Sequence, residues 1–310
     1  MRHMYVKIIF AFGFLSLLST IFIGFGVVLS KYDILADEHH GPFPVNEGFD
    51  LCERPGNSRT FETDNNEATS IPILLYHRII KEQDLSQKHY IDGEINPIIV
   101  TTENFKKQMT YLKENGFVTL TLDELYAFLT EGKAIPENSV VITFDDGYKD
   151  NYIEAYPILK KYNFYAANFL VTGSIRKNVH HYDPSKVQYL SLEELKASCG
   201  VFEFGSHTYT FHQKETKGGK ERAFLTSKSK KEVQKDLQTS FHQLGDNDFL
   251  AYPYGEYTPE TIEILEQLGT KMAFTLEERN ASPIDHIYEI PRFPISYSLS
   301  FEEFKDYVNQ

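Results

Sequence analysis

Two adjacent carboxylates, Asp145 and Asp146, follow the apolar residues at 140–142, which predict a buried strand. Desolvation and mutual repulsion both oppose the ionisation of two carboxylates at such a strand end. A divalent metal ion would relieve both penalties, and the segment Ser-His-Thr-Tyr-Thr-Phe-His at 206–212 offers two imidazole ligands. We therefore expect His207, His212 and one of the two carboxylates to bind a metal ion, which leaves the other carboxylate for proton transfer.

The spacing of the two histidines excludes a helical metal motif. Residues five apart share neither one face of a helix nor one face of a continuous strand. The pair fits a strand end followed by a loop that curls back to the same point. Phe202 and Phe204 give the preceding strand its alternation, and Gly205 permits close approach of the backbone.

Each of these motifs has an ordinary structural explanation when it is taken alone. Asp146-Gly147 is a common turn sequence, and many histidine pairs are surface residues. The motifs nevertheless coincide at the ends of several apolar runs. The run at 71–76 ends in His77, and the run at 249–252 ends in Pro-Tyr-Gly at 253–255. This coincidence favours one shared site.

Short apolar runs alternate with amphipathic segments from residue 71 onward. Helix starts are indicated by capping boxes at 121–124, 191–194 and 300–303 and by Thr-Pro at 258–259. This alternation predicts an α/β fold in which helices cover a parallel sheet, and seven or eight units fit a closed or nearly closed barrel. The expected strands span residues 72–76, 117–120, 139–144, 165–171, 201–206, 248–252, 271–275 and 287–290.

Active sites of such barrels lie at the carboxyl ends of the strands. The side chains that could bind a metal or take part in catalysis fall just after expected strands, which supports a single site. They are His77, Asp145, Asp146, His207, Tyr254 and Arg292.

The N-terminal residues 1–31 predict a membrane anchor. The uncharged apolar run at 8–29 is long enough to cross a bilayer core of about 30 Å. Arg2 and Lys7 precede it, so the N-terminus should stay cytoplasmic and the remainder should be exported. A cleaved signal peptide is the alternative, but the run is long for one and no Ala-x-Ala site follows. Residues 32–70 are polar and predict a flexible extracytoplasmic tether, followed by the catalytic domain at 71–310.

Composition narrows the partners but does not fix them. The net charge of −13 argues against nucleic acid and other anionic polymers, and it is compatible with a neutral or cationic substrate. Cys52 and Cys199 could form a disulfide in an exported protein, although nothing in the sequence brings them together. The sequence indicates no protein partner.

The chain resembles the polysaccharide deacetylases of the NodB-homology type, carbohydrate esterase family 4. Thr-Phe-Asp-Asp-Gly-Tyr at 143–148 matches the first motif of that family, and the segments at 206–212 and 251–255 resemble the second and third. The resemblance covers about residues 71–296 and implies a distorted (β/α) barrel. It also implies that Asp146, His207 and His212 bind the metal, most simply Zn²⁺, with Co²⁺, Ni²⁺ or Fe²⁺ as alternatives. Asp145 would be the general base.

Three departures from the usual pattern place the chain within the family. The histidine pair has one additional intervening residue, Ala251 stands where an arginine usually braces the base, and the usual C-terminal histidine acid is missing. These features resemble the branch that deacetylates poly-β-1,6-N-acetylglucosamine. In that branch an early histidine, here His77, is the acid. Arg292 could replace the missing brace, although an ordinary surface arginine is the alternative.

The resemblance implies a hydrolase that releases acetate from poly-β-1,6-N-acetylglucosamine at the cell surface and leaves a partly cationic polymer for biofilm adhesion. The backbone N–H of Tyr254 would stabilise the oxyanion. Tyr148, Tyr209, Phe211 and Tyr254 could contact sugar faces, with core packing as the alternative for each. The enzyme would be a single-pass membrane protein, or secreted or wall-associated if the N-terminus is cleaved. A peptidoglycan or chitin-oligomer deacetylase and a non-catalytic glycan-binding wall protein are the other candidate functions.

Overall fold

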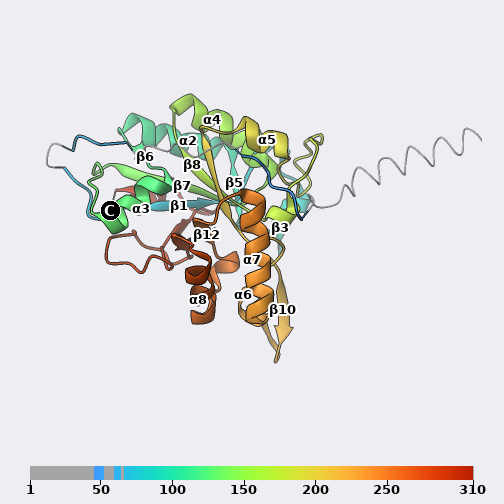
Figure 1. The fold of residues 1–310 in the computed structure, drawn as a ribbon. Helices are drawn as coiled ribbons and strands as arrows, with labels where there is room; N and C mark the ends of the chain where they lie inside the picture. Colours follow the sequence, from blue (N-terminus) through green and yellow to red (C-terminus); the bar gives the residue numbers. More distant parts are fainter. Residues whose placement is uncertain (1–44, 52–58, 64–65, 310) are drawn as a thin grey trace, which may run out of the picture. The chain divides into compact units, whose positions relative to one another are not determined.

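A curved parallel sheet organises the part of the chain that the computed structural model describes, residues 45–51, 59–63 and 66–309 (Figure 1). Within these residues the sheet has eight strands, and every residue of its central strands is buried, as expected when helices cover a parallel sheet. In spatial order the strands are β13 (Met272–Phe274), β12 (Phe249–Ala251), β9 (Phe202–Ser206), β8 (Ala166–Leu170), β7 (Ser139–Asp146), β1 (Ile73–Tyr76) and β14 (Phe293–Pro294), with β6 (Val118–Thr119) beside the start of β7.

The segment at 290–294 contacts both edges of this sheet. Ile290 forms a parallel bridge with Phe274 of β13, whereas Phe293 and Pro294 pair with β1. The predicted α/β class and parallel sheet are confirmed, and the sheet forms a half-barrel. The strand expected at 287–290 is wrong in position. The strand in this region is β14, which begins at Phe293. Ile290 forms only the single bridge with Phe274.

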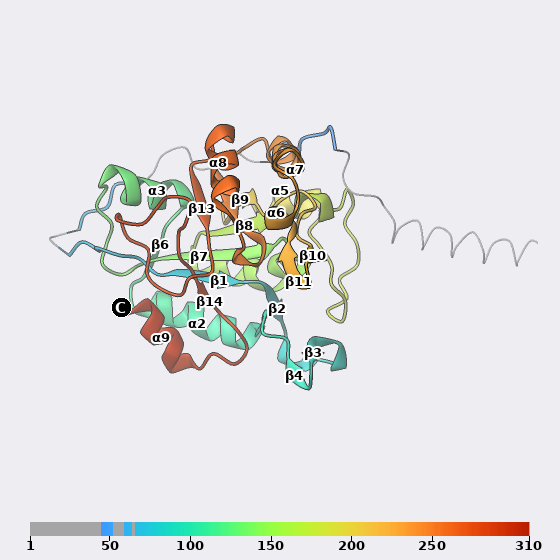
Figure 2. The same cartoon turned by 90° about the horizontal axis from the view of Figure 1, so that it is seen from below.

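Four of the helices begin where the sequence predicts a start. Capping boxes are present at Thr121, Ser191 and Ser300, and Thr258 caps the helix that starts with Pro259. The helices are α2 (Thr102–Glu114), α3 (Leu122–Glu131), α4 (Tyr156–Tyr162), α5 (Leu192–Ala197), α6 (Phe224–Ser227), α7 (Lys230–Leu244), α8 (Pro259–Leu268) and α9 (Phe301–Val308). Helix α9 lies beside α2, where Phe301 packs edge-on against Tyr111 with ring centroids 5.8 Å apart (Figure 2).

Short elements connect these layers. Single-turn helices follow several strand ends, and three small pairs of strands lie outside the main sheet. The helical turns are η1 (Glu82–Asp84), η2 (Gln87–His89), η3 (Asn151–Ala155), η4 (Thr172–Ser174) and η5 (Pro253–Gly255). The strand pairs are β2 (Arg78–Ile80) with β5 (Ile99–Thr101), β3 (Tyr90–Ile91) with β4 (Glu94–Ile95), and β10 (Lys214–Lys217) with β11 (Lys220–Ala223).

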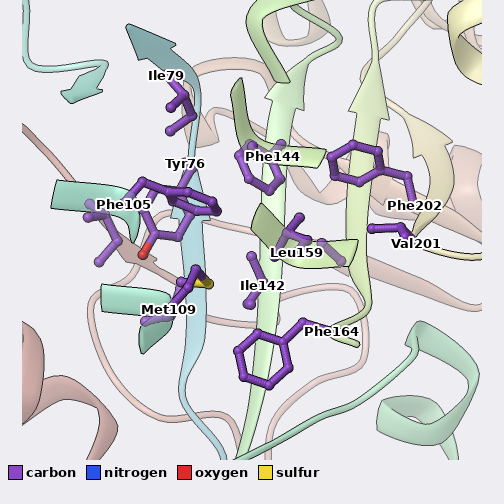
Figure 3. Close-up of a cluster of buried hydrophobic side chains, with 14 of the residues drawn as sticks. Tyr76, Ile79, Phe105, Met109, Ile142, Phe144, Leu159, Phe164, Val201 and Phe202 are labelled. Carbon is purple, nitrogen blue, oxygen red and sulfur yellow. The ribbon is translucent and has the colours of Figure 1, made fainter. Parts of the chain in front are cut away.

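The alternation of side chains along β7 separates core packing from chemistry. Ile142 and Phe144 point to the outer face, into a cluster that also contains Tyr76, Phe105 and Phe202 (Figure 3). Their neighbours in β7, among them Val141, Thr143 and Asp145, therefore face the concave side of the sheet. This register directs Asp145 into the interior of the half-barrel.

Parts of the expected tether are packed on the domain. Phe49 is 0% exposed within the outer core cluster, and its N–H donates to the carbonyl of Gln243. Arg59 forms an ion pair with Glu124 at 2.7 Å, and the N–H of Ala68 donates to the carbonyl of Ile135. The domain therefore begins before residue 71, and the sequence boundary was set too late for these stretches.

Two sequence predictions, the membrane anchor and a disulfide between Cys52 and Cys199, involve residues outside the described part. The apolar run at 8–29 and the rest of the expected anchor lie there. None of the helices in the described part combines the length and apolar character needed to cross a membrane. Cys199 is disulfide-bonded, and the described residues include no free cysteine. The second cysteine of the chain, Cys52, lies outside them.

Candidate active site

Asp146, His207 and His212 come together at the carboxyl end of the sheet. Oδ1 of Asp146 is 3.5 Å from Nε2 of His207 and 3.2 Å from Nε2 of His212. One ligand atom from each residue lies within 4.8 Å of the others. Nδ1 of His207 donates to the carbonyl of Ala251 at 2.8 Å, which leaves the Nε2 lone pair facing Asp146. The three side chains form a triad that could hold a metal ion.

The hydrogen bonding of Asp146 and the protonation state of His207 both suit metal binding. Oδ1 of Asp146 is buried and accepts no hydrogen bond from the described residues, although two imidazoles face it. Burial lowers the pKa of His207 to about 4, with the nearby His212 adding to this and Asp145 opposing it. The imidazole is therefore neutral at pH 7, which is its metal-binding form. One carboxylate and two imidazoles are a donor set that suits Zn²⁺.

The backbone is strained where three strands end at this triad. Asp146, Thr208 and Tyr254 adopt positive φ values of 76°, 75° and 60°. Each such residue costs of order 1–3 kcal/mol, and strain of this kind clusters at functional sites. Gly147 continues the turn with a φ of 74°, and a Cβ there would lie 2.9 Å from Leu170. The sharp turns redirect the side chains that follow each strand toward one point.

Arg292 holds Asp145 through two parallel hydrogen bonds. Its Nη1 and Nη2 atoms donate to Oδ1 and Oδ2 of Asp145 at 2.8 Å each, and Nε donates to the carbonyl of Thr275. Arg292 is 0% exposed, so it is not the surface arginine that the sequence left as an alternative. Burial alone would raise the pKa of Asp145, but Arg292, then His207 and His77, bring it down to about 2. Asp145 is therefore ionised at neutral pH.

His77 lies at the end of β1, beside Asp145 in the register of the sheet, because Tyr76 pairs with Phe144. The side chain of Asn151 donates to the carbonyl of His77 at 2.6 Å. The carboxylate of Asp150 accepts from the Ile79 N–H and from Arg78, both at 2.9 Å.

These contacts fix the chain on both sides of His77. Sequence reasoning missed Asp150 and Asn151, although their buried polar side chains lie only two and three residues after the motif at 143–148.

Tyr254 and Tyr148 lie next to the residues of the triad. Tyr254 is 38% exposed, and its ring centroid is 4.6 Å from that of His212. Tyr148 is buried and stacks on Tyr189 at 5.5 Å. Burial raises the pKa of Tyr148, and the charge of Asp146 raises it further. The sequence did not single out Tyr189, which reaches the site from a distant loop and therefore left no local signal.

The other two predicted aromatic contacts have different surroundings. The main chain of Tyr209 is hydrogen-bonded on both sides, to Gly173 and to Asp236. Phe211 packs edge-on against Phe224 at 5.5 Å and is partly buried against the core cluster of α7 and α8. Phe211 thus makes core contacts, and its contact with substrate stays a prediction.

Known proteins identify the class to which this fold and site belong. The family model described as polysaccharide deacetylase matches residues 132–273. The poly-beta-1,6-N-acetyl-D-glucosamine N-deacetylase of Staphylococcus epidermidis is 35% identical over 240 residues, which cover 74% of this chain and 80% of that protein. The protein of the same name from Staphylococcus aureus is 35% identical over 234 residues, covering 72% and 78%. The chain belongs to the polysaccharide deacetylase family and is a hydrolase that removes N-acetyl groups from polysaccharide.

Solved structures share its fold. The Streptococcus pyogenes deacetylase PplD in complex with acetate superposes with a TM-score of 0.64 at 28% identity, covering 78% of this chain and 100% of that one. IcaB from Ammonifex degensii superposes with a TM-score of 0.63 at 24% identity, covering 79% and 99%. The half-barrel is consistent with the (β/α) barrel of this family.

The metal triad should be separable from the proposed base by mutation. Asp146→Ala, His207→Ala or His212→Ala should lower metal content and activity together, because each removes a ligand. Asp145→Asn should keep the metal and lower turnover by about 10²–10⁴-fold, the usual contribution of general base catalysis. Metal analysis and acetate release of the purified variants test this. A metal-free Asp145→Asn beside a metal-loaded Asp146→Ala would reverse the assignment.

Removing the Arg292 guanidinium should leave the charge of Asp145 buried without a partner. We expect Arg292→Met to lower the free energy of unfolding by roughly 3–5 kcal/mol at pH 7. The control Arg222→Met removes an exposed arginine of β11 and should cost less than about 1 kcal/mol. Urea denaturation measures both, and adding Asp145→Asn should restore part of the loss. Equal losses in the two arginine variants would contradict this account of Arg292.

Proposed function

We propose that this protein is a metal-dependent N-deacetylase of poly-β-1,6-N-acetylglucosamine that acts outside the cell. The observation that carries the proposal is the buried Asp145–Arg292 pair beside the Asp146–His207–His212 triad. The names and coverage of the staphylococcal relatives support the choice of polymer. Partial deacetylation would leave protonated amines that hold the polymer to anionic cell surfaces, which is a basis for biofilm adhesion.

Asp146, His207 and His212 would hold the metal, and Zn²⁺ suits this donor set best, with Co²⁺, Ni²⁺ and Fe²⁺ as alternatives. When bound, the metal supplies Lewis acidity toward the acetamide carbonyl and toward water. Asp145, kept ionised by Arg292, takes a proton from the attacking water.

The backbone N–H of Tyr254 donates to the oxyanion as it develops. His77 then protonates the leaving nitrogen as the C–N bond breaks, so acetate and a glucosamine amine are released.

His77 should act as the acid. The observations that motivate this role are its place beside Asp145 and the fixed chain around it. His77→Ala should bind metal normally and lose turnover, and the alkaline limb of the pH–rate profile should change because the group that must carry a proton is absent. His242→Ala, which removes an exposed histidine of α7, is the matched control. A His77→Ala rate close to that of the control would rule out the role.

The substrate prediction concerns the linkage. The wider histidine spacing, the early His77 and the absent C-terminal acid support a β-1,6-linked polymer. We expect acetate release from β-1,6-linked N-acetylglucosamine oligomers to exceed release from β-1,4-linked oligomers of equal length, and to increase with chain length. A preference for the β-1,4 series would leave the deacetylase chemistry intact and would favour a chitin or peptidoglycan substrate.

We also propose that the apolar run at 8–29 anchors the protein, with the catalytic domain outside the membrane. The length of the run and the basic residues ahead of it support this orientation. Cell fractionation should find the full-length chain in the membrane, where protease reaches it on intact protoplasts. Recovery of a shortened form in the medium would instead indicate a cleaved signal, and thus a secreted or wall-associated enzyme.

A further inference from the structure

The loop at 208–211, which joins the two metal-site histidines, is held from one side by the backbone of η4. The N–H groups of Thr172 and Gly173 donate to the carbonyls of Thr208 and Tyr209 at 3.1 and 2.9 Å. The approach is close, because a Cβ on Gly173 would lie 2.6 Å from the Tyr209 carbonyl oxygen. This contact fixes the carbonyl side of the loop against the end of β8.

Asp236 of α7 holds the opposite side of the same loop. Its Oδ1 accepts from the Tyr209 N–H at 2.8 Å, and its Oδ2 accepts from the Thr210 N–H at 2.8 Å and the Thr210 hydroxyl at 3.1 Å. Asp236 is 5% exposed. Among the described residues no lysine or arginine lies within ion-pair distance of it. Successive backbone N–H groups that converge on one carboxylate form an anion-binding nest.

A second residue of α7 fixes the start of the loop. The hydroxyl groups of Ser240 and Ser206 are 2.7 Å apart, and the Ser206 oxygen accepts from the Thr208 N–H at 3.1 Å. Asp236 and Ser240 are four residues apart, so they lie on one face of the helix. That face of α7 therefore contacts the end of β9 and the loop that follows it.

The loop must reverse direction over a short distance. His207 and His212 are five residues apart, yet both present Nε2 to the same oxygen of Asp146. Thr208 supplies the turn with its positive φ of 75°. The N–H groups of Tyr209 and Thr210 then need acceptors that their own segment does not supply, and Asp236 provides them.

We propose that Asp236 is a positioning residue for the metal site, because it fixes the loop that returns His212 to Asp146. This inference rests on the proposed metal-dependent function and deepens it. The carboxylate does not reach the triad, and it acts through the backbone of the loop. The wider histidine spacing of this chain is thereby compatible with a compact site, since the additional residue lies in a loop that is hydrogen-bonded on both sides.

The test measures Zn²⁺ affinity of the purified full chain by competition with a chromogenic chelator, alongside thermal unfolding of the metal-free protein. Asp236→Ala should weaken Zn²⁺ binding about 10–100-fold, the range typical of residues that orient metal ligands. Asp236→Asn keeps one acceptor oxygen and should show a smaller loss in the same direction. It is the variant to compare if Asp236→Ala does not fold. The matched control is Glu263→Gln in α8. It removes an exposed carboxylate that pairs with Lys230 of α7, the helix that carries Asp236, at 3.0 Å. Its Zn²⁺ affinity should stay within twofold of wild type.

A double-variant comparison separates positioning from general stability. If Asp236 acts through His212, adding Asp236→Ala to His212→Ala should weaken Zn²⁺ binding no further. Unchanged Zn²⁺ affinity of folded Asp236 variants, or an equal loss with and without His212, would overturn the inference while the proposed function stands. A wild-type chain that binds none of Zn²⁺, Co²⁺, Ni²⁺ and Fe²⁺ would overturn both.

Discussion

Two neighbouring buried carboxylates at the end of the central strand are the constraint on which the rest of the site depends. Both cannot be ionised there unless each has its own compensating charge. Asp145 has the guanidinium of Arg292 at 2.8 Å, whereas Oδ1 of Asp146 faces two imidazoles and accepts no hydrogen bond from the described residues. The first arrangement is complete within the protein, whereas the second is one that the metal cation we propose would complete.

The backbone enforces this division of roles between the two carboxylates. Strand alternation turns Asp145 into the half-barrel, where the segment at 290–294 delivers Arg292 from between the two edges of the sheet. The positive φ of Asp146 then redirects the chain at the rim, toward the ends of β9 and β12. Two identical adjacent residues thus have different partners: Asp145 pairs with Arg292, and Asp146 faces two imidazoles. This difference fits the separate roles of base and metal ligand that we propose for them.

Local patterns in the sequence predicted the elements and the residues at strand ends. The capping boxes and the strand runs before residue 276 were confirmed because hydrophobic alternation and cap chemistry are local properties. Arg292 stayed undecided because its contact with Asp145 spans 147 residues, and no local signal separates a buried arginine from a surface one. The stretches before residue 71 were misjudged because their composition is polar, although single residues such as Phe49 are buried in the domain core.

The supporting residues were the least predictable part. Asp236, Asn151 and Tyr189 occur in a helix or in loops, where polar and aromatic residues are ordinary, and their importance arises only from tertiary contacts. None of the three lies within the motifs at 143–148, 206–212 and 251–255. Motif residues thus identify the chemistry, and the packing of α7, η3 and the distant loops determines the geometry in which it occurs.

A crystal structure of the protein grown with Zn²⁺, with data collected at the zinc absorption edge, tests the central claim most directly. The account predicts one anomalous peak about 2.0–2.2 Å from an oxygen of Asp146 and from Nε2 of His207 and His212. Arg292 should remain paired with both oxygens of Asp145. A zinc ion coordinated by Asp145, with Arg292 displaced from it, would contradict the account.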